Sequence, residues 1–271
     1  GRHSAQFTPR NATLRSPVSP FKCSYNVYYV KYNMILLLSA MPEEIAALRP
    51  GLTSSELQFG AGREFALGAI DAQPLVLAFS RWGKVAAAAT AAHALSRYPI
   101  QAVVFTGIAG ALKQDLKIGD LVLADRLFQH DLDARPFFAP TEVPLLGLSA
   151  LPACATLAGR LEAAYERWAE AEQQAGRAAP TLHRGAIATG DQVIGDEVAR
   201  ERVQRVTPEA LCVEMEGAAV AQVCHEFGLP YACLRMISDH ADERLTPEQV
   251  YSLARRSGET TLGILRHLSK P

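Results

Sequence analysis

From Met34 onward, short apolar runs alternate with longer stretches in which apolar residues recur every three or four positions. Short runs between turn residues are typical of buried β-strands, and the longer recurrence is typical of helices with one apolar face. The runs predict strands over residues 35–38, 65–70, 75–79, 102–105, 120–124, 185–189 and 231–237. The recurrence predicts helices over residues 42–48, 84–98, 154–176 and 220–227, and a last helix within 247–267.

Strands that alternate with helices indicate an α/β fold whose sheet is covered by helices on both faces. We therefore expect a three-layer α/β/α domain around a central mixed, mostly parallel sheet. No repeat and no linker-like segment interrupts residues 34–271, which predicts a single domain there.

Residues 1–33 differ from the rest, because they carry scattered Ser, Pro, Arg and Asn without a sustained period. They contain no clear amphipathic helix, which argues against a transit peptide. We expect an upstream extension or a cloning remnant that is poorly ordered, although residues 27–30 could add an edge strand.

The composition is that of an ordinary globular protein, with 49% hydrophobic and 20% charged residues in 271. A net charge of −1 gives no reason to expect nucleic acid or a membrane as a partner. The longest apolar run, 34–38, is too short to span a bilayer. Three of the five cysteines, Cys212, Cys224 and Cys233, lie in apolar patterns and are expected in a reducing compartment, which predicts a cytoplasmic location.

The segment 212–224 places two carboxylates, Glu214 and Glu216, directly before a predicted helix. The point where a strand turns into a helix is a frequent place for ligand groups in α/β proteins. A simpler explanation is that both side chains are solvated or favour the helix N-terminus. The other strand ends decide between these interpretations.

Polar or Gly-rich groups follow several of the other predicted strands, where ligands bind in such folds. The residues at these strand ends are Met41, Glu43, Glu44, Ser80, Arg81, Trp82, residues 106–110, residues 189–191, Ser238 and Asp239. The set is rich in carboxylates and poor in cations, which suits a neutral, hydroxyl-rich ligand better than a polyphosphate.

Each of these motifs taken alone has a simpler explanation. Residues 106–110 lack the Lys of a phosphate loop and the spacing of a dinucleotide fingerprint, so a tight turn is the default. Residues 130–133 contain His and Asp, but no second His or Cys cluster supports a metal site. Asp239 could serve only as a turn or cap residue. No Ser-His-Asp arrangement stands out.

Six segments taken together, in order along the chain, resemble a known family. They are residues 39–44, 106–110, 117–122, 189–191, 213–216 and 235–239. From Met34 to the C-terminus the chain resembles the methylthioadenosine/S-adenosylhomocysteine nucleosidases of the nucleoside phosphorylase superfamily. The resemblance implies hydrolysis of the N-glycosidic bond of 5′-thio-substituted adenosines to adenine and a thioribose, without a cofactor or a metal.

The resemblance also implies a role for each catalytic residue. Glu44 would position and activate the water, and Asp239 would give a proton to N7 of the leaving adenine. Ser238 would hold Asp239. These roles agree with the chemistry, because the bond breaks through an oxocarbenium-like state and the base leaves more readily when it is protonated.

The substrate contacts follow from the same resemblance. Glu216 would bind the ribose diol while Met215 packs on the sugar, and the backbone of Val193 and Ile194 would meet the purine edge. Phe137 of a second copy would reach the 5′ pocket, which implies a homodimer. The remaining contacts would be Met41, Ile108, Ala109 and Gly110.

Three positions depart from the family pattern: Pro42 replaces an acid, Ile108 a serine, and Val193 the aromatic that stacks on adenine. The last two concern the choice of nucleoside, so a futalosine or hopanoid-pathway nucleoside stays open as a substrate. A second alternative is a purine nucleoside phosphorylase, for which Arg81 could bind phosphate while Phe105 occupies the usual Arg position. A third is a catalytically silent nucleoside-binding protein, disfavoured because the acid and the water-activating carboxylate are both present.

Overall fold

The computed structural model describes residues 34–242 and 245–268. Residues 1–33, with the edge strand predicted at 27–30, lie outside this part of the chain. The strands are β1 (Met34–Ser39), β2 (Thr53–Gly60), β3 (Arg63–Ile70), β4 (Gln73–Phe79), β5 (Ile100–Ala111), β6 (Leu121–Gln129), β7 (Leu151–Pro152), β8 (Leu182–Thr189), β9 (Ala210–Glu214) and β10 (Tyr231–Asp239). The helices are α1 (Pro42–Leu48), the 3₁₀ turn η1 (Arg49–Gly51), α2 (Lys84–Arg97), α3 (Ala155–Gln174), α4 (Glu197–Val206), α5 (Gly217–Phe227) and α6 (Pro247–Leu265).

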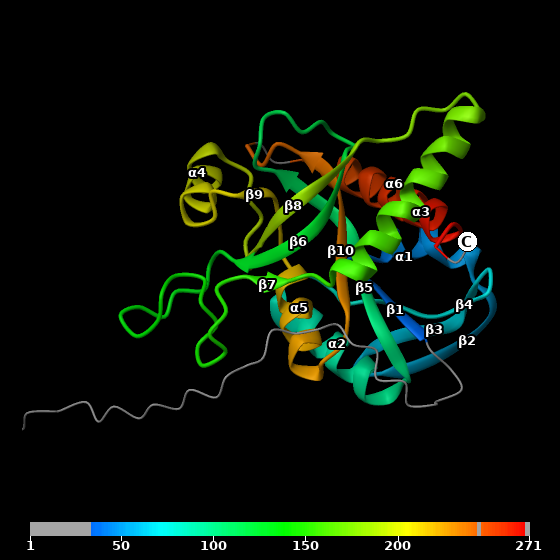
Figure 1. Ribbon diagram of the computed structural model, residues 1–271, viewed down its shortest axis with the longest axis horizontal. Coiled ribbons are helices and arrows are strands. Elements are labelled where there is room, and N and C mark those ends of the chain that lie inside the picture. The colour runs from blue at the N-terminus through cyan, green and yellow to red at the C-terminus, as the bar shows by residue number, and fades with distance from the viewer. Residues whose placement is uncertain (1–33, 243–244, 269–271) are drawn as a thin grey trace, which may run out of the picture.

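The strands form one mixed sheet, part of which closes on itself (Figure 1). Its order is β10-β6-β8-β9-β5-β1-β4-β3-β2, and β10 also pairs with β5, so that five strands complete a barrel-like ring. Among the ten pairings between the described strands, five are antiparallel. The prediction of an α/β fold with a mixed sheet is confirmed. The pairings divide equally between parallel and antiparallel, and part of the sheet closes into a ring, which the sequence analysis did not predict.

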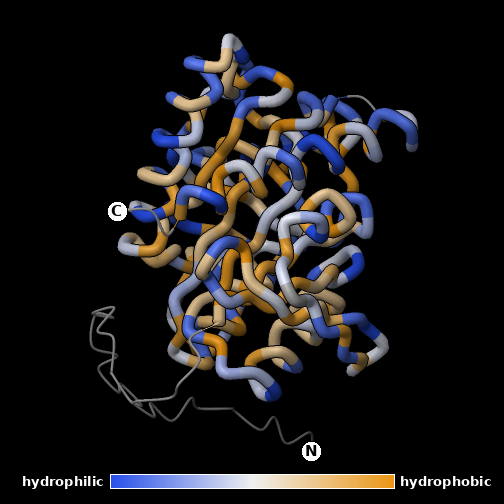
Figure 2. The backbone as a smooth tube through the Cα atoms, turned by 90° about the vertical axis from the view of Figure 1, so that its right-hand side faces the viewer, coloured by the Kyte–Doolittle hydropathy of each residue, from blue (hydrophilic) through white to orange (hydrophobic). Residues whose placement is uncertain are grey.

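Both faces of the strand β1 are covered by apolar clusters. Leu36 and Leu38 pack in one cluster with residues of α2 and α5. Ile35 and Leu37 point the other way and pack in a second cluster with residues of α1, α3 and α6. This alternation explains why β1 is apolar from Met34 to Leu38, since a strand with two covered faces has no solvent side. Figure 2 shows the hydrophobic segments running through the middle of the molecule.

The predicted elements are present, with one correction and several omissions. Residues 106–110, expected as a tight turn, continue the strand β5 to Ala111. Gly107 adopts φ +152° inside this strand, a conformation that favours glycine. The strands β2, β7 and β9 and the helix α4 were not predicted. The side chains of β2 are mostly exposed, and α4 buries only Val203. Neither segment therefore has the apolar pattern on which the prediction depends.

The strand β10 pairs with β5 through a shift in register near its end. Ile237 lies opposite Ala109, and Asp239, two residues later, lies opposite the next residue, Gly110. The end of β10 and the end of β5 therefore meet at the same rim of the ring.

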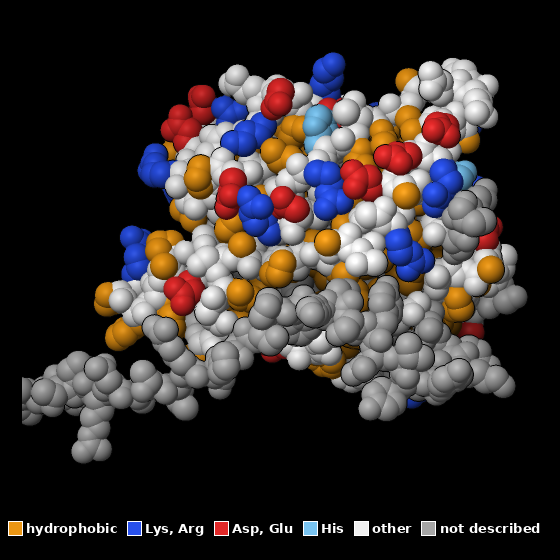
Figure 3. All heavy atoms as spheres, viewed as in Figure 1, with side chains coloured by type: hydrophobic (Ala, Val, Ile, Leu, Met, Phe, Trp, Pro, Cys, Tyr) orange, Lys and Arg blue, Asp and Glu red, His pale blue; other side chains and the backbone are white. Residues whose placement is uncertain are grey.

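On the face shown in Figure 3, acidic and basic side chains are interspersed, so no field of one sign covers that face. None of the described helices is both long and apolar enough to cross a membrane.

Candidate active site

A cavity of about 360 Å³ opens at the rim where β1, β5, β9 and β10 end. It contains every residue that the sequence analysis assigned to the site except Phe137. Those lining it are Met41, Glu44, Ile108, Ala109, Gly110, Val193, Ile194, Met215, Glu216, Ser238 and Asp239. Met41 and Asp239, which are 198 positions apart in the chain, thus meet in one place because four strands end at the same edge.

Glu44 is a buried carboxylate at the start of α1. Its Oε2 accepts hydrogen bonds from the backbone N–H groups of Ala40 and Met41, both at 3.1 Å. Its Oε1 accepts one from the N–H of Ile108 at 3.2 Å, which ties α1 to β5. Burial raises the pKa of Glu44 to about 7, although Arg235 and these N–H groups oppose the rise. Glu44 can therefore exchange a proton near neutral pH.

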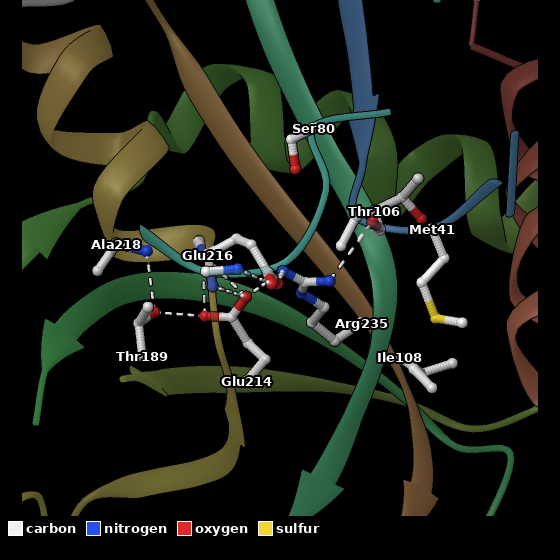
Figure 4. Close-up of polar contacts among 12 residues, drawn as sticks. Met41, Ser80, Thr106, Ile108, Thr189, Glu214, Glu216, Ala218 and Arg235 are labelled. Carbon is white, nitrogen blue, oxygen red and sulfur yellow. Dashed lines mark hydrogen bonds and ion pairs between the residues drawn. The ribbon is translucent and has the colours of Figure 1, made fainter. Parts of the chain in front are cut away.

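Glu214 forms a buried ion pair with Arg235 (Figure 4). The same carboxylate accepts hydrogen bonds from the Thr189 hydroxyl and from the backbone N–H groups of Glu216 and Gly217. The Arg235 guanidinium lies 4.4 Å from the centre of the Phe105 ring. Glu214 is thus fully occupied by protein donors, and its role is to hold Arg235 and the start of α5.

Glu216 lines the same cavity but has few protein partners. Its Oε1 accepts a hydrogen bond from the N–H of Gly83 at 2.9 Å, and its Oε2 lies 3.5 Å from Arg235 Nη2. Burial and the neighbouring charge of Glu214 raise the pKa of Glu216. Of the two glutamates, Glu216 is the one that keeps acceptor capacity for a ligand.

Asp239 ends β10 beside Ser238. Its Oδ1 accepts a hydrogen bond from the N–H of Ala241 at 2.7 Å, and its Oδ2 lies 2.5 Å from the Ser238 hydroxyl. That hydroxyl also lies 3.2 Å from the carbonyl oxygen of Ala109. A protonated Asp239 could donate to the Ser238 oxygen while Ser238 donates to Ala109, so the geometry accommodates an acid here.

The chain matches the sequence pattern of the phosphorylase superfamily over residues 34–270. The chain belongs to the phosphorylase superfamily. The 5′-methylthioadenosine/S-adenosylhomocysteine nucleosidase of Geobacillus thermodenitrificans is 37% identical over 235 residues, 84% of this chain and 94% of the relative. The aminodeoxyfutalosine nucleosidase of Helicobacter pylori J99 is also 37% identical, over 77% of this chain and 86% of the relative.

A solved structure of this superfamily has the same fold. The methylthioadenosine/S-adenosylhomocysteine nucleosidase of Streptococcus pneumoniae, with the transition-state inhibitor MT-ImmA, superposes with a TM-score of 0.77 at 31% identity. The match covers 87% of this chain and all of that one. The membership in the nucleosidase family predicted from the sequence motifs is confirmed.

Several cavity residues received no role in the sequence analysis, among them Arg235, Trp82 and Tyr251. Arg235 belongs to the segment 235–239 but received no role. It lies in an apolar strand pattern, and the sequence alone does not show which carboxylate it contacts. Trp82 and Tyr251 also line the cavity. Trp82 follows the end of β4 and was noted there without a role, and Tyr251 lies within α6, away from any strand end.

Phe137 and Arg81, to which the sequence analysis gave possible roles in substrate or phosphate binding, both lie outside the cavity lining. Phe137 is 85% exposed. Arg81, the cation that the phosphorylase alternative required, donates a hydrogen bond to the carbonyl of Gly62 at 2.8 Å. Among the described residues, no group of three or more His, Cys, Asp or Glu side chains is placed to hold a metal ion.

The raised pKa of Glu44 predicts the pH dependence of activity. A carboxylate that accepts a proton from water works only when ionised, so kcat/KM should fall as the pH drops below about 7. The raised pKa of Glu216 acts in the same direction, because its ionised form favours a developing positive charge. The measurement is kcat/KM between about pH 5 and pH 9.

Glu43→Gln is the matched control for this profile, since Glu43 precedes Glu44 on the same helix turn and does not line the cavity. It should keep the acidic limb of the wild-type curve, whereas Glu44→Gln should remove most activity across the range. A flat wild-type profile down to about pH 5 would remove Glu44 as the base.

Proposed function

We propose that the protein hydrolyses the N-glycosidic bond of 5′-thio-substituted adenosines, namely methylthioadenosine and S-adenosylhomocysteine, to adenine and the corresponding thioribose. The observation that carries the proposal is the placement of Glu44, Glu216 and Asp239 around one cavity. Hydrolysis of this bond needs a base for water, an anion near the developing cation and an acid for the leaving purine.

In this mechanism water attacks C1′ of the ribose as the bond from C1′ to N9 of adenine breaks. Glu44 takes a proton from the water, and Asp239 gives a proton to N7, so adenine leaves as a neutral molecule. Glu216 accepts hydrogen bonds from the ribose hydroxyls, as its free acceptor capacity allows. Met215, Met41 and Ile108 would contact the sugar side, and the backbone of Val193 and Ile194 the purine edge.

The charges in the cavity favour water over phosphate as the nucleophile. Phosphate binding requires cations that are free to pair with it. Arg235 is the cation among the described lining residues, and it is already paired with Glu214. Arg81 is engaged elsewhere, with the Gly62 carbonyl.

We test the proposal by product analysis with methylthioadenosine, first in phosphate-free buffer and then with phosphate added. Adenine and free methylthioribose should form in both buffers at the same rate. Turnover only with phosphate, giving a sugar 1-phosphate, would instead support the phosphorylase alternative.

A second candidate substrate is aminodeoxyfutalosine. The aminodeoxyfutalosine nucleosidase of Helicobacter pylori and the methylthioadenosine/S-adenosylhomocysteine nucleosidase of Geobacillus thermodenitrificans are both 37% identical to this chain. Measurement of kcat/KM for aminodeoxyfutalosine and for methylthioadenosine in the same assay decides between the two substrates. A higher kcat/KM for aminodeoxyfutalosine would assign the chain to that nucleoside.

The proposal extends to the setting of the enzyme. It would act in the cytoplasm, in the salvage of methionine, on a small nucleoside without a cofactor. It would be a homodimer in which Phe137 of one copy reaches the 5′ pocket of the other. The high exposure of Phe137 and its position outside the cavity of its own chain support this arrangement.

A further inference from the structure

Asp131 follows the strand β6 and lies outside the cavity lining, and the mechanism above gives it no role. Its carboxylate joins two segments that are distant in sequence. Oδ1 accepts a hydrogen bond from the Lys84 ammonium at 2.6 Å, and Oδ2 accepts one from the backbone N–H of Asp191 at 2.9 Å. Lys84 begins α2, and Asp191 lies just after β8. Asp131 therefore connects the ends of β6 and β8 to the start of α2.

Asp191 adds a second bond between the same segments. Its Oδ1 accepts a hydrogen bond from the backbone N–H of Lys84 at 2.7 Å. The neighbouring Gly83 has φ +92°, a conformation that favours glycine, and a methyl group on it would lie 3.1 Å from the same oxygen. Lys84 is thus held twice, by Asp191 through its backbone and by Asp131 through its side chain.

The residue next to Lys84 carries the donor that orients Glu216. The backbone N–H of Gly83 donates a hydrogen bond to Glu216 Oε1 at 2.9 Å. The contact between Glu216 Oε2 and Arg235 Nη2 is longer, at 3.5 Å. The position of the carboxylate assigned to the ribose therefore depends mainly on one backbone N–H, and that N–H is only as fixed as the turn that carries it.

The loop 190–194, which carries the residues assigned to the purine edge, is held to the same network. The backbone N–H of His130 donates to the carbonyl of Thr189 at 2.9 Å. The His130 ring packs so closely on Gly190 that any side chain on Gly190 would overlap it. Asp131 thus extends from a backbone that is already joined to this loop, and it fixes the loop relative to the turn at Gly83.

Asp131 is ionised, as an ion pair with Lys84 requires. Burial raises the pKa of its carboxyl, but the hydrogen bonds from the Lys84 ammonium and from the N–H of Asp191 outweigh burial and hold the pKa below its usual range. The side chains of Lys84 and Asp131 are 17% and 27% exposed. Salt screens a partly shielded pair of this kind less than a fully exposed one.

We propose that Asp131 is a positioning residue that, through Lys84 and Asp191, fixes the turn at Gly83 and thereby orients Glu216 toward the ribose hydroxyls. The proposal deepens the proposed function and rests on it. A displacement of ~1 Å in a site can lower a rate by about 10²-fold. Because Glu216 favours the developing positive charge more than the neutral ribose, its displacement should lower kcat more than it raises KM.

Steady-state kinetics with methylthioadenosine test the proposal. Asp131→Asn should lower kcat by about 10- to 100-fold with a smaller change in KM. Asparagine has the same shape, but its single acceptor oxygen cannot serve both donors. Lys84→Met should cause a similar loss, and Lys84→Arg should restore most of the rate because it keeps a cation. Asp125→Asn is the matched control, since Asp125 lies on β6, pairs with Arg126 at 3.1 Å and does not line the cavity.

The pH profile separates this role from a loss of stability. Burial raises the pKa of Glu216, and the hydrogen bond from the N–H of Gly83 lowers it. The other charged groups that act on Glu216 are Glu214 and Glu44, which raise its pKa, and Arg235, which lowers it. A looser turn weakens the bond from Gly83, so Asp131→Asn should move the acidic limb of kcat/KM to higher pH. Partial unfolding would lower the whole curve without moving this limb.

Four outcomes overturn the proposal. Wild-type kcat, KM and pH profile in Asp131→Asn would remove the positioning role and leave the proposed function intact. A loss of activity together with a lower molecular mass in light scattering would show that Asp131 acts through the assembly of copies. If Asp131→Asn does not fold, equal kcat in Lys84→Met and Lys84→Arg would exclude the ion pair. A wild-type protein that releases no adenine from methylthioadenosine or aminodeoxyfutalosine would overturn the proposed function and this inference with it.

Discussion

Replacement of Asp239 by asparagine is expected to lower kcat by about 10²- to 10⁴-fold while the binding of methylthioadenosine stays measurable. Asparagine has the same shape, and it can keep the hydrogen bond from the N–H of Ala241 and a contact with the Ser238 hydroxyl. It cannot give an acid proton to the departing adenine. The loss should therefore fall on the chemical step and not on the fold or on binding.

Steady-state kinetics and calorimetric titration with methylthioadenosine measure the two effects separately. Asp242→Asn is the matched control, because Asp242 lies on the same loop, pairs with Arg200 at 3.5 Å and does not line the cavity. It should keep the wild-type kcat. Near-normal turnover by Asp239→Asn would remove Asp239 from the mechanism.

Replacement of Arg235 by methionine is expected to lower the free energy of unfolding by about 3–5 kcal/mol. The substitution keeps an apolar stem that can pack on Phe105, but it leaves the carboxylates of Glu214 and Glu216 without their shared cation in a buried site. A buried carboxylate without a partner is strongly unfavourable. The measurement is unfolding in urea, in which the midpoint and the slope of the transition give the free energy of unfolding.

Arg184→Met is the control for this substitution, since Arg184 pairs with Glu162 at the surface at 3.1 Å. Exposed pairs contribute roughly 0–1 kcal/mol, so that variant should unfold close to the wild type. If Arg235→Met lost less than about 1 kcal/mol, the Glu214 carboxylate would have to be neutral or solvated in the folded protein.

The position of a strand was predictable where its own residues form an apolar run. The overall shape of the sheet was not, because it depends on which strands pair with each other. Residues 35–38 are apolar throughout, and the structure shows both of their faces covered. The closure of the sheet depends on the pairing of β10 with both β5 and β6. No local pattern in residues 231–237 encodes two partners, so the ring was not foreseen.

The site was predictable as a set of residues, but the residue pattern alone, without the family resemblance, did not predict the role of each. The pattern places Glu214 and Glu216 two positions apart and does not say which one meets a cation. That depends on Arg235, which reaches them from another strand. Trp82 was noted after a strand end but received no role, because the bonds that hold its turn run from Gly83 and Lys84 to Glu216 and Asp191, more than a hundred residues away.

The register shift near the end of β10 has a consequence for the acid. Along a regular strand, neighbouring side chains point to opposite faces. Ser238 and Asp239 are neighbours, yet both line the same cavity and lie 2.5 Å apart. The irregular step after Ile237 makes this possible. A shortening of the chain by one residue at this step would restore the alternation and turn one of the two away, so the pairing of hydroxyl and acid depends on backbone spacing as much as on the identity of the two side chains.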